Sequence, residues 1–117
     1  MNNKLEIFEL AGVIHSEIPQ KDRELFLSRT KTLEELVYQN PTQIIIDLTK
    51  VKSMSSWGEE RLEDLIASTV INKTKIAAIL PKHNTGVGIA WKYLFLEEGL
   101  FKVCASMEEA KSWLKEV

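Results

Sequence analysis

The sequence predicts a single α/β domain in which helices pack against a central sheet. Ile44-Ile45-Ile46 begins one apolar run and residues 75–80 form a second, which is typical of strands buried on both faces. Between them, residues 57–71 have helical periodicity after a Ser-x-x-Glu pattern, so a helix crosses from one strand to the next and makes them parallel. The 117 residues, 44% hydrophobic and 27% charged, fit one domain over 1–117.

The first half of the chain is predicted to form a strand, a helix, a second strand and a second helix. Residues 5–14 form the first strand, in which Gly12 marks either a bulge or a tight turn. Residues 21–39 form a helix with apolar or small residues at helical spacing, namely Phe26, Thr30, Leu33 and Val37. Asn40-Pro41 stops this helix, and residues 42–48 form the next strand. The following helix buries Leu62, Leu65, Ile66, Thr69 and Val70.

The second half repeats the alternation. Strand 75–80 ends at Pro81, helix 87–98 ends at Gly99, and strand 101–104 follows. Ser106-Met107-Glu108-Glu109 is a second capping box, and its helix buries Met107, Ala110, Trp113, Leu114 and Val117. We therefore expect the order β-α-β-α-β-α-β-α. The sheet should be mixed and four- to five-stranded, with strands 42–48 and 75–80 parallel at its centre and four helices packed against it.

Composition excludes several classes of function. The net charge is -2 and the lysines are spread along the chain, so no basic stripe is present to bind nucleic acid. The first residues lack the apolar core of a secretion signal, and no apolar stretch approaches the roughly 20 residues of a membrane span. We expect a cytoplasmic protein without membrane insertion. The single cysteine, Cys104, lies in an apolar setting and is expected to be a buried structural thiol.

Three local patterns resemble the STAS domain family, the SpoIIAA-like anti-sigma-factor antagonists. They are residues 44–48 followed by Val51 and Met54-Ser55-Ser56-Trp57-Gly58, then Gly99-Leu100-Phe101-Lys102-Val103, and Leu10-Ala11-Gly12-Val13-Ile14. The resemblance implies a STAS-like, non-enzymatic bacterial module in signal transduction and transcription regulation. The implied partner is an anti-sigma factor, a kinase-like regulator, or other STAS subunits.

The resemblance also aligns the loop before the second helix. Family antagonists read Met-Asp-Ser-Ser-Gly there, and the first serine is phosphorylated by a partner kinase. Ser55 stands at the aspartate position, Ser56 at the phosphorylatable serine and Trp57 at the next serine. The resemblance therefore makes Ser56 the candidate phosphorylation site, without the family aspartate.

From the residues themselves, Ser56 caps the second helix together with Glu59. A phosphate at a helix N-terminus meets free N–H groups and the positive end of the dipole. The predicted partner surface is the loop over 50–58 and the start of its helix, with Met54, Ser55, Ser56, Trp57, Gly58 and Arg61. Trp57 either projects toward solvent or folds back into the core, and the sequence favours neither.

An alternative is a small-ligand or lipid-binding module. Residues 86–93 and 107–114 resemble a second SpoIIAA-like branch, related to the CRAL-TRIO lipid-transfer fold. Trp91 and Phe95, one helical turn apart, would cover a ligand cavity or a homodimer contact. We expect the protein to have no enzymatic activity and to bind no cofactor or metal. Gly86-Val87-Gly88 lacks the third glycine of a nucleotide loop, and neither histidine has a ligand at metal spacing.

Overall fold

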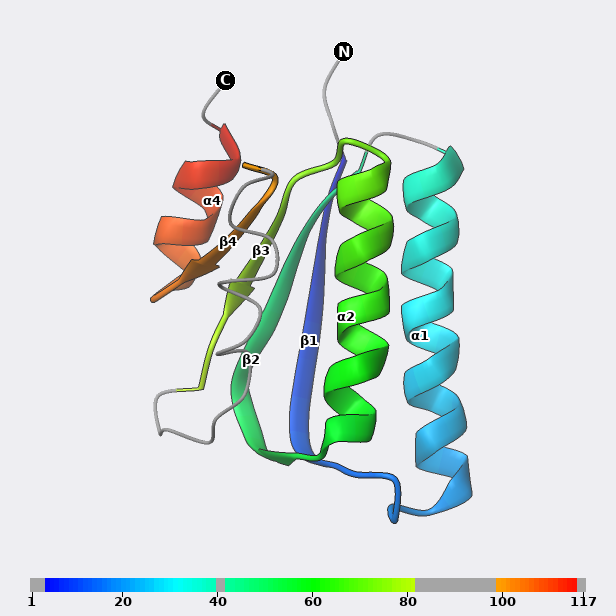
Figure 1. Cartoon of the computed structure of the whole chain (residues 1–117). Coiled ribbons are helices and arrows are strands. Elements are labelled where there is room, and N and C mark those ends of the chain that lie inside the picture. Colours follow the sequence, from blue (N-terminus) through cyan, green and yellow to red (C-terminus); the bar gives the residue numbers. More distant parts are fainter. Residues whose placement is uncertain (1–3, 40–41, 82–98, 116–117) are drawn as a thin grey trace.

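A computed structural model of the chain describes residues 4–39, 42–81 and 99–115 (Figure 1). The described elements are β1 (Lys4–Ile14), α1 (Gln20–Gln39), β2 (Thr42–Met54), α2 (Ser56–Ile71), β3 (Ile76–Ile79), β4 (Phe101–Cys104) and α4 (Met107–Lys115). These elements confirm the α/β class. The helix predicted over 87–98 lies outside the described residues, so the expected fourth helix and the complete element order stay predictions.

The described sheet has four strands in the order β1-β2-β3-β4. β2 and β3 are its central pair and run parallel, as predicted, with Ile44 opposite Ile76 and Asp47 opposite Ile79. The prediction of a mixed sheet is wrong for these strands, because β1 and β4 are also parallel to their neighbours. A tight turn at Gly12, one of the two predicted alternatives, would have reversed the first strand. Residues 4–14 instead continue as one strand, and α1 carries the chain back to start β2 in the same direction.

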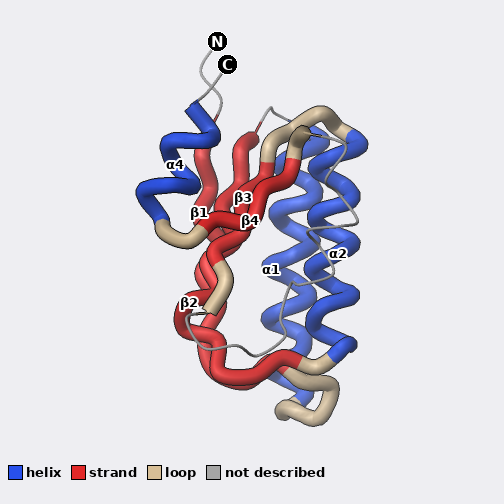
Figure 2. The backbone as a smooth tube through the Cα atoms, turned by 60° about the vertical axis from the view of Figure 1, so that its left-hand side comes forward, coloured by secondary structure: helices blue, strands red, loops and turns tan. Residues whose placement is uncertain are grey.

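The sheet separates two apolar clusters. α1 and α2 lie side by side over one face, where Ile44 and Ile46 are fully buried (Figure 1). α4 packs near β3 and β4 on the opposite face, where Ile45 and Ala77 are fully buried (Figure 2). Because successive strand residues point to opposite faces, the three consecutive isoleucines serve both clusters. This explains why the run shows no polar alternation.

The helix faces predicted from periodicity are buried. In α1 these residues are Phe26, Thr30, Leu33 and Val37, and in α2 they are Leu62, Leu65, Ile66 and Thr69. In α4, Ala110 and Leu114 are buried while Met107 and Trp113 pack against the same cluster. The side chain of Val70 and residue Val117 lie outside the described part of the chain.

Cys104 is buried at the end of β4, as predicted. Burial, and secondarily the Glu109 carboxylate, raises the pKa of the Cys104 thiol above its usual value, and Lys102 opposes this shift. Because the thiolate is the reactive form, the raised pKa makes this thiol less reactive. The described residues therefore support a structural role for Cys104.

Candidate functional site

β2 extends further than predicted and removes most of the expected loop. The predicted strand ended at Leu48, but β2 continues to Met54, where it pairs with Ile14 of β1. Only Ser55 separates β2 from α2, which begins at Ser56. Residues 50–54 are therefore strand, and the candidate site is reduced to residues 54–58, the β2–α2 turn.

Two irregularities in β2 make this extension compatible with pairing. From Glu9 to Ala11 in β1, the partner in β2 advances from Asp47 to Lys50, so β2 holds one extra residue there. The Asp47 carboxylate accepts hydrogen bonds from the Thr49 amide (3.0 Å) and hydroxyl (2.7 Å), which stabilises this first bulge. A second extra residue of β2 lies opposite the step from Gly12 to Val13, and Gly12 has φ 76°.

The β2–α2 turn is fixed to the end of β1 by two contacts. The Ser55 amide donates to the Ile14 carbonyl at 3.0 Å. The His15 imidazole Nε2 and the Ser53 hydroxyl share a hydrogen bond at 2.7 Å. Sequence reasoning missed this contact of His15, because its partner lies 38 positions away. These contacts hold the start of α2 in one position.

Ser55, and not Ser56, stands at the N-cap of α2. The first helical hydrogen bond runs from the Glu59 amide to the Ser55 carbonyl at 3.1 Å, so Ser56 is already the first helical residue. The predicted capping box of Ser56 and Glu59 is therefore wrong by one position. The Ser55 hydroxyl is itself buried and has no hydrogen-bond partner in the described part of the chain. The cap is set by backbone pairing with β1, and no serine side chain is needed for it.

Ser56 is the exposed member of the turn. It lies in the first turn of α2, where the amides of Ser56, Trp57 and Gly58 have no helical acceptor. These N–H groups and the helix dipole favour an anion near the Ser56 hydroxyl. Arg61, predicted to contact a partner, forms ion pairs with Glu60 at 3.6 Å and Asp64 at 4.0 Å. Its guanidinium therefore adds little free positive charge beside Ser56.

The apolar residues of the turn pack mainly toward the core. The sequence alone could not decide this orientation. Trp57 is partly buried against the core, and its ring lies 5.6 Å from the Phe26 ring at an interplanar angle of 50°. Met54 also packs partly against this core. Gly58 is buried, and a Cβ there would meet Ile14 Cγ2 and Met54 Cγ at 2.9 Å. Gly58 therefore has a structural role, while Trp57 and Met54 leave only part of their surface open.

Two predicted site residues, Trp91 and Phe95, are still to be considered. Trp91 and Phe95 lie outside the described residues, so the ligand cavity or dimer contact proposed for them stays a prediction. In the described part of the chain, no group of three or more His, Cys, Asp or Glu side chains is placed to hold a metal ion. None of the described helices is long and apolar enough to cross a membrane.

The sequence matches no protein-family model and no curated protein. Among solved structures, the chain is similar to the anti-sigma factor antagonist SpoIIAA in its unphosphorylated form. The TM-score is 0.64 at 13% sequence identity, and the match covers 100% of this chain and 94% of that chain. At this identity the likeness shows the fold. The SpoIIAA-like fold that the sequence resemblance implied is confirmed.

Proposed function

We propose that this protein is a non-enzymatic regulatory module that binds a partner protein through the β2–α2 turn and the exposed side of α2. The partner would be an anti-sigma factor, a kinase-like regulator or another STAS subunit. The observation that carries the proposal is an exposed serine, Ser56, in the first turn of a helix whose start is fixed by β1. The full-length similarity to SpoIIAA, an anti-sigma factor antagonist, supports it.

Phosphorylation of Ser56 would regulate this contact. A phosphoryl group at that position would add about two negative charges beside the unpaired amides of the first turn of α2. It would not disturb the core, because Ser56 is exposed while Trp57 and Gly58 make the packing contacts. The carboxylates of Glu59 and Glu60 oppose the added charge, so the expected effect is on partner binding more than on stability.

The test compares partner affinity for the wild-type chain, Ser56→Ala and Ser56→Asp by calorimetry, after a partner has been captured from the source organism. We expect Ser56→Asp to change the dissociation constant by about tenfold or more, while Ser56→Ala stays close to wild type. Ser112→Asp, on the exposed face of α4, is the matched control. Equal affinities for the wild type, Ser56→Asp and Ser112→Asp would rule out regulation at Ser56.

A further inference from the structure

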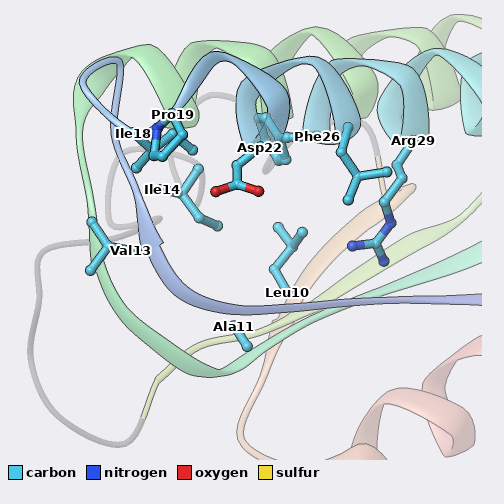
Figure 3. Close-up of a pocket in the computed structure, with 10 residues that line it drawn as sticks. Leu10, Ala11, Val13, Ile14, Ile18, Pro19, Asp22, Phe26 and Arg29 are labelled. Carbon is cyan, nitrogen blue, oxygen red and sulfur yellow. The ribbon is translucent and has the colours of Figure 1, made fainter.

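A groove of about 400 Å³ lies between the second half of β1 and the first turns of α1 (Figure 3). Most of its lining is apolar and includes Leu10, Ala11, Val13, Ile14, Leu25 and Phe26. It adjoins the β2–α2 turn through Ile14 but does not contain Ser56.

The groove runs along the free edge of β1. Leu10 and Ile14 are buried toward the helices, whereas Ala11 and Val13 are exposed on the other side of the strand. Successive strand residues point to opposite faces, so a groove lined by both sets must pass the edge between them. β1 is the outermost strand of the described sheet, and its outer backbone groups are available for pairing there.

The rim of this groove exposes apolar surface. Leu25 is 60% exposed on α1, and Val13 is 49% exposed on β1. A free strand edge bordered by exposed apolar side chains is a template for pairing with another extended chain. The groove therefore has the two features of a strand-addition site: a backbone edge and apolar contacts beside it.

Two opposite charges lie along the groove, Asp22 near its middle and Arg29 at one end (Figure 3). The Asp22 side chain points from α1 into the groove (Figure 3). The Arg29 guanidinium lies over the Phe8 ring at 4.5 Å and donates to the Glu9 carbonyl at 2.9 Å. Asp22 and Arg29 are seven positions apart on one helix, or about 10 Å along its axis. The remaining N–H donors of Arg29 suit a carboxylate.

We propose that this groove binds an extended segment of a partner protein, which adds to the edge of β1 as a further strand. Its apolar side chains would pack against Leu25 and Val13, a basic side chain would pair with Asp22, and an acidic one with Arg29. Arg29 covers the outer edge of β1 at Glu9, so an added strand would lie along residues 10–14. Strand residues four positions apart are separated by about 13 Å, a distance that flexible lysine and glutamate side chains can adjust to the roughly 10 Å between Asp22 and Arg29.

The probe is the capped peptide acetyl-Lys-Val-Ile-Val-Glu-amide, titrated into the isotope-labelled full chain and followed by NMR. We expect the amide signals of residues 10–14 and of the first two turns of α1 to shift. Leu25→Ser should weaken binding about fivefold or more. Tyr38→Ser, on the same helix at 67% exposure but outside the groove lining, should leave binding unchanged. Ser56→Asp should also leave it unchanged, so this test is independent of the proposed phosphorylation.

A second peptide, with serine in place of its lysine and glutamate, tests the charges. Asp22→Asn and Arg29→Gln should each weaken the charged peptide severalfold and leave the serine peptide unaffected. Absence of shifts at residues 10–14, or equal losses for both peptides, would overturn the proposal. The proposal would also be overturned if the chain formed a dimer without peptide, seen by sedimentation, and Leu25→Ser abolished that dimer. The groove would then be a contact between two copies of the chain.

Discussion

The starts of α2 and α4 share a Ser-x-x-Glu pattern, yet only at α4 does the hydroxyl of its serine cap the helix. At α4, the Glu109 amide donates to the Ser106 hydroxyl at 3.1 Å, and the Glu109 carboxylate accepts from the Ala105 amide at 2.7 Å. At α2, the N-cap is Ser55, one residue before the pattern, and its hydroxyl lies buried without a partner in the described part of the chain.

The difference lies in what precedes each helix. Ala105 and Ser106 are exposed, so local side-chain hydrogen bonds select the cap. Ser55 follows a strand that is paired to its last residue, and its amide is already bonded to Ile14. At α2 the sheet therefore sets the helix start, and the exposure of Ser56 follows from it. In this chain the capping pattern marks the N-cap correctly at α4, where no strand pairing competes with it.

Among the variants that test this comparison, Gly58→Ala should change the stability of the protein most. An added Cβ would approach Ile14 Cγ2 and Met54 Cγ at 2.9 Å and the Ile14 carbonyl at 3.1 Å, so the strand end or the helix must shift. We expect a loss of about 2 kcal/mol in the free energy of unfolding, measured in urea, despite the better helix propensity of alanine. Ser112→Ala, on the exposed face of α4, is the control. A gain of about 1 kcal/mol from Gly58→Ala would show that α2 is not held against β1.

Ser106→Ala should have the next largest effect. It removes the oxygen that accepts from the Glu109 amide, and loss of such a cap costs about 1 kcal/mol. Urea unfolding measures the loss, and Ser106→Asp, which keeps a capping oxygen, should recover most of it. If alanine and aspartate proved equally stable, the capping role of Ser106 would be refuted.

Ser55→Ala should change stability little, although Ser55 stands at the N-cap position. Its hydroxyl is buried without a described partner, so its removal loses no hydrogen bond, and we expect a change within about 0.5 kcal/mol. Urea unfolding of Ser55→Ala and the wild type measures this change. A cost equal to that of Ser106→Ala would mean that the two helix starts are capped alike.

Glu34→Gln should give the smallest effect and concerns the contact of α2 with α1. Burial, then the carboxylates of Asp64 and Glu35, raises the pKa of Glu34 above its usual 4.5, while Lys31 opposes the shift. The folded state thus favours the protonated form. This stabilisation is complete below pH 4.5 and is lost as pH rises through the raised pKa.

Thermal melts should therefore show a small rise in Tm for Glu34→Gln at pH 7 and almost none at pH 3.5. Glu17→Gln, in the exposed turn before α1, is the control and should show no such difference. A gain of equal size at both pH values would contradict a charge effect.

The sequence by itself determined the class of fold and the faces of its helices. Ile44-Ile45-Ile46 predicted a strand buried on both sides, and helical spacing predicted the buried faces of α1 and α2. These features depend on periodicity, which is local to each segment. The short resemblance motifs also predicted a SpoIIAA-like fold, which the structural comparison confirmed.

One further feature was present in the sequence and was misread. Lys50-Val51-Lys52 alternates between exposed and buried side chains, which is the pattern of a half-exposed strand. The predicted strand ended at Leu48, so this stretch fell within the expected loop, whereas in the structure β2 passes through a bulge between Asp47 and Lys50 and continues.

Only the tertiary structure decided the geometry of the candidate site. The end of β2, the N-cap at Ser55, the His15 contact with Ser53 and the free edge of β1 all depend on pairing between segments distant in sequence. A backbone amide bonds to whichever carbonyl the fold brings near it, and residue type hardly constrains that choice. The side chains of Ser55 and Ser56 both suit a cap, and the carbonyl of Ile14 selected between them.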